Sequence, residues 1–217
     1  MKSLLVLLLV FIGATSVAQD YTLYFSPMSL QVNSLEYNLT YQKGKHLFGV
    51  SYGIPITSKV NTFGDYDTNF SNLKNDTRIL RIGYSHYFIN DKYKMLNNTY
   101  LGTCLNNYKS TYTGSSNLNK VSENIYTNSI SLELGYDIFI LKRFYLELYT
   151  GVEPSISHST IESKSISAND AILMKVYIDD MVDGKSEISN NTVTINQKDE
   201  FSNCFYYGVR IGIKLNK

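Results

Sequence analysis

Large apolar residues alternate with small or polar residues through most of the chain. Every second residue is large and apolar between Ile130 and Ile138, and the pattern recurs in Phe144–Val152 and Tyr207–Leu215. Successive side chains of a β-strand point to opposite faces, so this period of two predicts half-exposed strands. Eight such segments predict an all-β protein: 20–26, 29–42, 47–56, 77–89, 95–107, 125–139, 144–156 and 203–215.

The connections between these segments alternate in length. The short ones are 43–46, 90–94 and 141–143. The long, polar ones are 57–76, 108–124 and 157–203. Short turns at one end and long loops at the other predict an up-and-down antiparallel transmembrane β-barrel with short periplasmic turns and long extracellular loops. An even number of strands places both ends of the barrel on the side of the short turns.

Two apolar stretches inside the last long segment leave the strand count open. Ala171–Asp179 and Thr192–Asn196 are both apolar enough to form strands. They would either make a hairpin that extends above the rim or join the wall as two further strands, which would make ten.

The first eighteen residues have the layout of a secretory signal peptide. Lys2 gives a basic start, Leu4–Ile12 is an unbroken apolar run, and Ser16 and Ala18 fit the small-residue positions of a cleavage site. The apolar run is too short to span a bilayer as a helix. We therefore expect residues 1–18 to be removed on export and 19–217 to form one barrel domain.

The polar rows of the strands indicate which face meets which medium. A barrel in water would hide its apolar rows, whereas a membrane barrel turns them outward. The polar rows combine charges with Gly and Ser, and small residues inside a narrow barrel make room for larger inward side chains. The inward charges form a predicted lumen charge network of Glu36, Arg81, Glu133, Asp137, Glu147, Glu153, Arg210 and Lys214.

Aromatic residues on the apolar rows gather beside the short turns. These residues are Tyr41, Phe48, Tyr84, Phe88, Tyr136 and Phe144. Membrane barrels carry aromatic girdles where their wall crosses the membrane interface. The six residues are therefore predicted to form such a girdle.

With these features the chain resembles the small eight-stranded outer-membrane barrels of the OmpA/OmpX-like type. Ala18-Gln19 resembles the end of the signal peptide in outer-membrane β-barrel proteins of Bacteroidota-like bacteria. The resemblance implies location in the Gram-negative outer membrane, contact with outer-membrane lipid, insertion by the barrel assembly machinery and a monomeric state. One departure is the end of the last strand, Leu215-Asn216-Lys217, which lacks the terminal aromatic residue that the assembly machinery recognises in the family.

Charge and cysteine content narrow the function further. The chain has 20 Lys and Arg against 19 Asp and Glu, which lacks the basic excess of a nucleic-acid-binding protein. Its two cysteines exclude a four-cysteine zinc site, and its three histidines have no metal-binding spacing. We expect no cofactor. Cys104 and Cys204 share inward parity, and a disulfide between them stays open because their strands are predicted to lie nearly opposite.

The leading prediction is a non-enzymatic outer-membrane barrel that presents loops for surface interaction or envelope integrity. Eight strands enclose a lumen that side chains can fill, so the inward charges are expected to plug it, with an ion pathway as the alternative. The apolar residues of segment 157–202 are predicted to bind a surface partner.

Two other classes of protein stay open. A secreted, lipocalin-like barrel would place the apolar rows inside, around an apolar ligand, and leave Glu133 and Arg210 in water. A lipid A-modifying enzyme would need His158 within hydrogen-bond distance of a serine such as Ser155 or Ser157.

Overall fold

The computed structural model describes most of residues 21–215. The described residues are 21–27, 34–56, 58–59, 71–88, 98–115, 119–141, 143–165, 167–179, 184–197 and 199–215. Within these ranges the side chains of 58–59, 71–73, 119, 174, 177–179 and 184–185 are not described. The predicted signal peptide, residues 1–18, lies outside the described residues.

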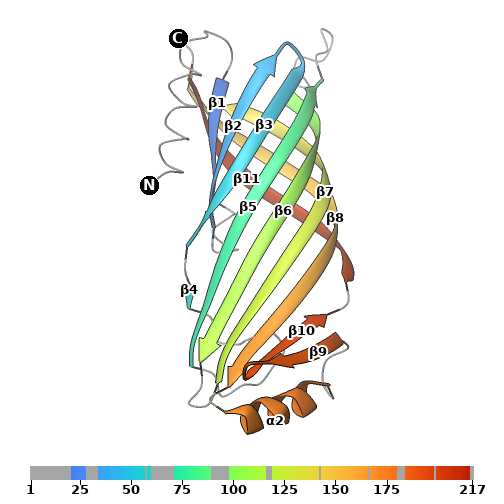
Figure 1. Ribbon diagram of the computed structural model, residues 1–217. Coiled ribbons are helices and arrows are strands. Elements are labelled where there is room, and N and C mark those ends of the chain that lie inside the picture. The colour runs from blue at the N-terminus through green and yellow to red at the C-terminus, as the bar shows by residue number, and fades with distance from the viewer. Residues whose placement is uncertain are drawn as a thin grey trace.

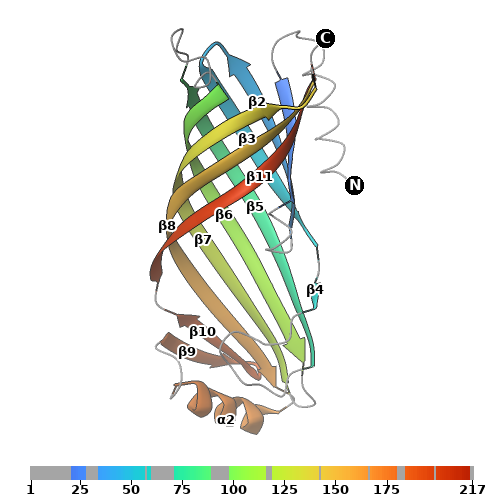
Figure 2. The same cartoon turned by 180° about the vertical axis from the view of Figure 1, so that it is seen from behind.

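Eight antiparallel strands close into a ring (Figures 1 and 2). The strands of the ring are β1 (Tyr21–Ser26), β2 (Ser34–Lys43), β3 (His46–Pro55), β5 (Ser71–Tyr87), β6 (Thr99–Ser115), β7 (Asn119–Phe139), β8 (Phe144–Ser165) and β11 (Glu200–Lys214). Each pairs with its neighbour in chain order, and β11 pairs with both β8 and β1. The predicted up-and-down eight-strand architecture is confirmed.

The ring closes between its first and last strands. β1 pairs with β11 from Thr22 to Phe25, and the backbone N–H of Leu215 donates to the carbonyl of Tyr21 at 2.9 Å. Tyr21 also pairs with Tyr41, close to the turn between β2 and β3. Both ends of the barrel therefore lie on the side of the short turns, as predicted.

Local sequence explains the tight turn between β2 and β3. Lys43 pairs with His46, so Gly44 and Lys45 form a two-residue connection. Gly44 has a φ of 60°, and a glycine with positive φ at the first central position is the pattern of a type II′ hairpin turn.

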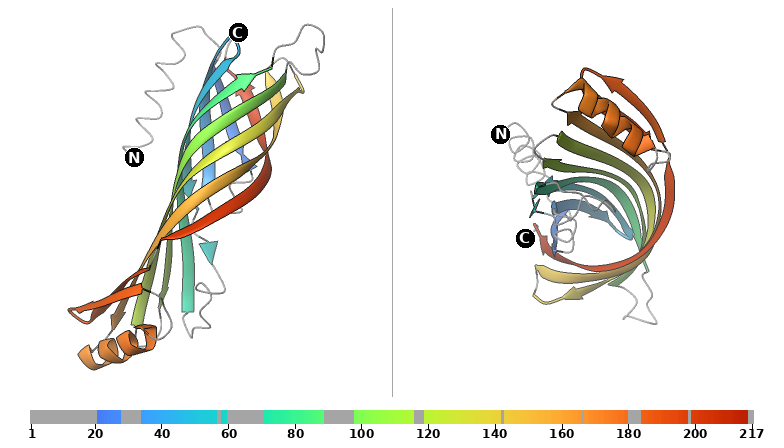
Figure 3. Two further views of the ribbon diagram at one scale, coloured as in Figure 1. Left: turned by 90° about the vertical axis from the view of Figure 1, so that its right-hand side faces the viewer. Right: turned by 90° about the horizontal axis from the view of Figure 1, so that it is seen from below.

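Strands β5 to β8 continue well beyond the ring as a curved, open sheet, here called the extension (Figure 3). Where β11 leaves β8 after Ser157, β10 (Thr192–Gln197) takes its place and pairs with Thr160–Lys164. β10 forms a hairpin with β9 (Gly184–Ser189), and the short β4 (Ser58–Lys59) pairs with β5 on the other edge. The extension is thus the sheet β4–β5–β6–β7–β8–β10–β9.

The extension corrects the predicted long loops. Segment 108–124 is mostly strand, because β6 reaches Ser115 and β7 begins at Asn119. Segment 157–202 contains the end of β8, a helix and a hairpin rather than one loop. Polar residues flank these strands on the outer face because this part of the sheet stands clear of the apolar wall, and in the sequence such polarity is typical of a loop.

The stretch Ala171–Asp179 is helical, so its prediction as a strand is wrong. It belongs to α2 (Ala168–Asp179), which packs against β8, β9 and β10 (Figure 1). Ser167 starts the helix: its Oγ accepts from the backbone N–H of Asp170 at 3.2 Å and donates to the Asp170 carboxylate at 2.6 Å. This reciprocal cap at Ser-x-x-Asp resembles a capping box and is visible in the sequence.

Thr192–Asn196 does form a hairpin beyond the rim, but its partner is β9 rather than Ala171–Asp179. Asn190 and Asn191 both have positive φ, at 48° and 61°, which fits a type I′ turn. The alternative of ten wall strands is wrong, because β8 and β11 close the ring before the hairpin is reached.

Candidate functional site

The lumen of the ring holds a buried ionic cluster built on four strands. Arg210 of β11 bonds both oxygens of Glu133 of β7, at 2.7 and 2.8 Å, and Glu147 of β8 at 2.5 Å. The hydroxyl of Tyr100, on β6, donates to both carboxylates. Arg210, Glu133 and Glu147 are only 7%, 4% and 3% exposed. Charges buried this deeply are stable only when paired, and here each has charged and neutral partners.

Aromatic rings complete the surroundings of Arg210. Its guanidinium carbon lies 3.9 Å from the ring centroid of Tyr149, and Tyr206 donates to Glu133 at 3.3 Å. The planar guanidinium suits both a bidentate carboxylate and an aromatic face. The cluster therefore holds β6, β7, β8 and β11 together across the lumen.

A second cluster lies in the lumen, nearer the extension than the first. Arg81 lies 3.3 Å from Glu36 and donates to the Tyr108 hydroxyl at 3.1 Å. That hydroxyl donates to Glu153 at 2.9 Å, and Asn106 donates to the same carboxylate oxygen at 3.0 Å. Ser129 also hydrogen-bonds to Glu153. The structure thus links Glu36, Arg81 and Glu153 in one chain of contacts.

The two remaining charges of the predicted network are not hydrogen-bond partners of Arg210 among the described residues. Asp137 accepts from the Tyr87 hydroxyl at 2.7 Å and is the ladder partner of Glu147, so a third carboxylate lies beside the Arg210 cluster. The Lys214 ammonium lies 5.0 Å from the ring centroid of Phe139, and Lys214 pairs with Thr22.

Inward tyrosines complete the lumen, and Tyr100 is one that the sequence analysis did not place there. Tyr100 faces Gly135 across the ladder, and an added Cβ on Gly135 would lie 2.1 Å from the tyrosine ring. Tyr149 covers Gly208 in the same way, at 2.3 Å. The signal was present, because Tyr100 has the same parity as Cys104, which we had assigned to the interior.

Little space is left in the lumen. A cavity of about 30 Å³ lies beside Arg81 and Arg210, among residues of both clusters. That volume suits one or two water molecules rather than a continuous channel. The arrangement is chemically suited to closing the barrel by hydrogen bonds and ion pairs.

The outer face of the ring is apolar. Leu132 is 54% exposed and Leu105 61% exposed. Further exposed apolar residues on the wall are Phe48, Val50, Ile82, Leu101, Ile130, Leu134, Leu148, Val152, Phe205, Tyr207 and Ile211. A water-soluble monomer rarely exposes contiguous apolar surface beyond a few hundred Å². The lipocalin-like alternative is therefore wrong, since the apolar rows lie outside and Glu133 and Arg210 lie inside.

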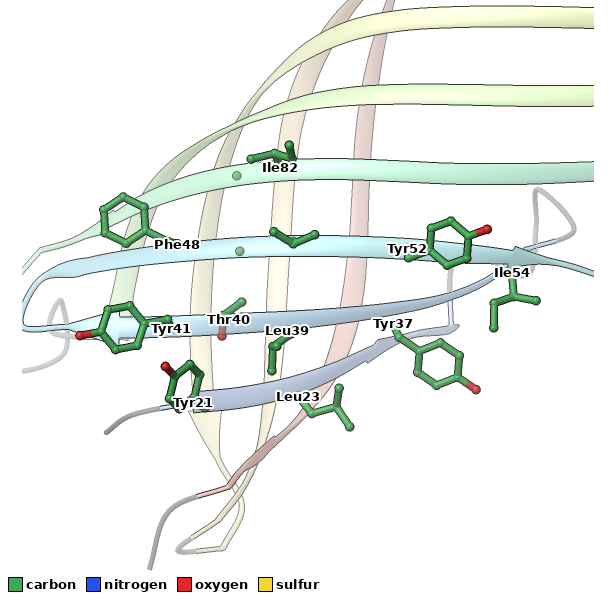
Figure 4. Close-up of a pocket in the computed structure, with 13 residues that line it drawn as sticks. Tyr21, Leu23, Tyr37, Leu39, Thr40, Tyr41, Phe48, Tyr52, Ile54 and Ile82 are labelled. Atoms are coloured by element: carbon green, nitrogen blue, oxygen red, sulfur yellow. The ribbon is translucent and has the colours of Figure 1, made fainter. Parts of the chain in front are cut away.

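One part of this apolar face forms a shallow groove of about 530 Å³ on β1, β2, β3 and β5 (Figure 4). Tyr21, Tyr41 and Phe48 lie at its turn-side end, and Tyr37 and Tyr52 lie at the other. The middle of the groove is lined by aliphatic side chains, among them Leu23, Leu39, Val50 and Ile82.

The residues of the predicted aromatic girdle lie at the turn-side end of the wall. Tyr41, Phe48 and Tyr84 are consecutive partners across β2, β3 and β5, and the rings of Phe48 and Tyr84 are 5.3 Å apart. Phe88, Tyr136 and Phe144 lie beside the other short connections, and Phe88 and Phe144 are exposed.

The disulfide that the sequence left open does not form. Cys104 and Cys204 are both free cysteines, on the non-adjacent strands β6 and β11. Because β6 and β11 are not neighbours in the ring, strand pairing does not place the two cysteines side by side.

The histidine and serines of the enzymatic alternative do not meet. His158 bonds Asp199 at 3.0 Å, whereas Ser155 bonds Ser202 and Ser157 bonds Thr127. His158 and the two serines alternate along β8 and point to opposite faces. Among the described residues, no cluster of three or more His, Cys, Asp or Glu could hold a metal ion.

The extension has a small core of its own. Val121 of β7, Ile161 of β8 and Val193 and Ile195 of β10 are buried, and so is Ala171 of α2. Glu123 lies beside this core and accepts a hydrogen bond from Ser159 at 2.8 Å. Burial, and then the nearby Glu123 carboxylate, raises the pKa of Tyr112. No helix in the described part of the chain is long and apolar enough to cross a membrane.

Comparisons with known proteins add one structural similarity. No family model matches the chain, and no curated protein sequence matches it. The crystal structure of CarO from Acinetobacter baumannii is similar over 92% of this chain and 99% of CarO, at 12% identity and a TM-score of 0.36. A similarity of that size carries no functional conclusion, so function must come from the wall and lumen of this chain.

Proposed function

We propose that this chain is an integral outer-membrane β-barrel protein of a Gram-negative bacterium, with no catalytic role. The observation that carries the proposal is the inversion of the ring: charged groups lie inside and aliphatic and aromatic groups lie outside. In water this arrangement would expose the apolar wall, whereas in a bilayer it satisfies both faces.

The proposed cell location rests on the N-terminal sequence together with the apolar wall. The N-terminal sequence supports export, with residues 1–18 removed and 19–217 forming the barrel. Ala18-Gln19 supports a source among Bacteroidota-like bacteria and kinship with the OmpA/OmpX-like barrels. Insertion would require the barrel assembly machinery, and a ring that closes on itself supports a monomer.

The lumen is proposed to be plugged. Arg210, Glu133 and Glu147 cross it, and the remaining cavity of about 30 Å³ does not provide a pore. Single-channel recording in planar bilayers should show no stable conductance, and a stable open level would contradict the plug.

The extension is proposed to present a binding surface on the extracellular side. Ile172, Leu173 and Val176 of α2 are exposed apolar residues at its far end. They belong to the apolar stretch of the predicted partner-binding segment 157–202, and their side chains are described. Substituting the three by Ser should abolish attachment to the surface partner without disturbing the barrel.

Cell fractionation with gel mobility tests the membrane assignment. The protein should be recovered with the outer membrane, and its band should shift between unboiled and boiled samples, because a closed barrel resists detergent until heated. A soluble periplasmic protein without a heat-shifted band would overturn the proposal.

A further inference from the structure

Two cations face each other at the edge of the apolar wall that adjoins the extension. Arg78 of β5 and Lys109 of β6 are direct partners in the ladder, on the outer face. Like charges directly opposite on adjacent strands destabilise a sheet. Neither side chain forms an ion pair with a carboxylate among the described residues, and the Lys109 ammonium lies 4.9 Å from the ring centroid of Tyr126. The pair is therefore a site where a bound anion would relieve repulsion.

A groove in the apolar wall begins beside this pair, on the side away from the extension. Its volume is about 670 Å³, within the range of small-molecule sites. Leu80 lies two residues after Arg78 on the outer face of β5, and Leu105 lies four residues before Lys109 on the outer face of β6. The groove continues across β7, β8 and β11, where Ile130, Ile156 and Phe201 line it.

The groove in Figure 4 provides an internal comparison. It has a similar size, about 530 Å³, and an aliphatic middle, but tyrosines and a phenylalanine mark its two ends, whereas the groove beside Arg78 and Lys109 also has asparagines and serines in its lining. Neither groove has a cation among its described lining residues. Lys43, two residues beyond Tyr41, is a cation near the first groove, and its ladder partner is His46. Arg78 and Lys109 are instead partners of each other, and it is this pair that would select by headgroup charge.

We infer that Arg78 and Lys109 bind the anionic phosphate headgroup of a membrane lipid whose acyl chains occupy the adjacent groove. The inference rests on the proposed function, because the groove meets lipid only if the ring spans a bilayer. With the extension outside the cell, the lipid belongs to the outer leaflet. Its required chemistry is a phosphate charge that no cation in the same headgroup neutralises.

A second like-charge pair supplies a matched control. Lys120 of β7 and Lys164 of β8 are also direct partners on the outer face. Lys120 lies six residues beyond Tyr126, the partner of Lys109, which places it about 20 Å further along the sheet. Its surroundings are mainly polar, so it offers charge without an adjacent acyl groove.

The test is native mass spectrometry of the mature protein from nanodiscs that mix phosphatidylglycerol and phosphatidylcholine with identical acyl chains. The wild type should retain phosphatidylglycerol preferentially. Arg78→Gln with Lys109→Gln should lower that preference about thirtyfold, since each cation beside an anionic headgroup contributes about a factor of five. Lys120→Gln with Lys164→Gln should leave it unchanged.

Further arms separate a lipid from a free anion and from general surface charge. Leu105→Ser with Phe201→Ser should reduce lipid retention, and inorganic phosphate alone should not compete. Equal retention by the wild type and the Arg78–Lys109 variant would overturn the inference. An equal loss in both charge variants, or binding of inorganic phosphate with no effect of the groove substitutions, would also overturn it.

The heat-shifted band of each variant in pure phosphatidylcholine is read in parallel. Loss of that band in the wild type contradicts the proposed function. A normal band without lipid preference contradicts only this inference.

Discussion

The closed ring and the extension share strands β5 to β8 but have opposite polarity. On β7 the ring part turns Glu133 inward and Leu132 outward, whereas the extension part turns Val121 inward and Lys120 outward. Strand β8 changes in the same way, from inward Glu147 to inward Ile161. The pairing of β6 with β7 continues through the change, whereas that of β7 with β8 skips Ile130 and Ser131, where Pro154 on β8 has no N–H to donate.

This reversal of inward and outward side chains indicates where the surroundings of the sheet change from apolar to aqueous. Backbone pairing makes a strand in either environment, but side chains must match what they touch. On β7 the outer face changes between Ile130 and Asn128, and Asn128 accepts a hydrogen bond from Asn107 at 2.9 Å. In the proposed function, one continuous strand serves as membrane wall and as water-exposed sheet.

The largest effect is expected where the ring depends on buried charge. Arg210→Ala leaves Glu133 and Glu147 without their cation and should lower the free energy of unfolding by about 3–5 kcal/mol. Urea titration in vesicles, followed by the heat-shifted band, measures it. Arg143→Ala, at the exposed turn before β8, removes the same charge and should change stability by less than about 0.5 kcal/mol. Equal effects would show that the cluster does not stabilise the ring.

A substitution in the core of the extension should lower the stability of the extension without unfolding the ring. Ile195→Ala opens a cavity beside Ile161 and should cost about 2–5 kcal/mol of local stability. Limited proteolysis and hydrogen exchange of β9, β10 and α2 should increase, while the heat-shifted band persists. Thr194→Ala, on the other face of β10, is the control. Loss of the band in Ile195→Ala would mean that the two regions fold as one unit.

The outer face gives the sharpest contrast along one strand. Leu132→Arg places a charge on the membrane wall and should cost about 2–4 kcal/mol if it lies near the bilayer centre. Ser122→Arg, ten residues earlier on the same face, meets water and should change stability by less than about 0.5 kcal/mol. Unfolding titrations of both variants in vesicles measure the difference. Similar costs at both positions would remove the proposed boundary.

The smallest effect concerns the helix of the extension. Ser167→Ala removes the cap of α2 and should cost about 1 kcal/mol, detected as faster hydrogen exchange in Ala168–Asp179. Ser167→Asp keeps a capping oxygen and should restore protection. Unchanged exchange in Ser167→Ala would show that packing against β8, β9 and β10, rather than the cap, holds the helix.

Part of the extension could have been predicted. Ser167-x-x-Asp170 signals a helix start, and the adjacent Asn190 and Asn191 signal a tight turn. The apolar content of Ala171–Asp179 favours a strand only when this cap is left out of account. The free state of Cys104 and Cys204 agrees with the distance between their strands, which the predicted strand order already implied.

The sequence by itself determined the strands, the inward and outward rows and the number that closes the ring. These features depend on a period of two and on turn lengths, which are local properties. Only the tertiary structure decided that Arg210 meets both Glu133 and Glu147, that Tyr100 lies over Gly135, and that Arg78 faces Lys109. Such contacts depend on register and strand tilt around a closed ring, where residues more than sixty positions apart become neighbours.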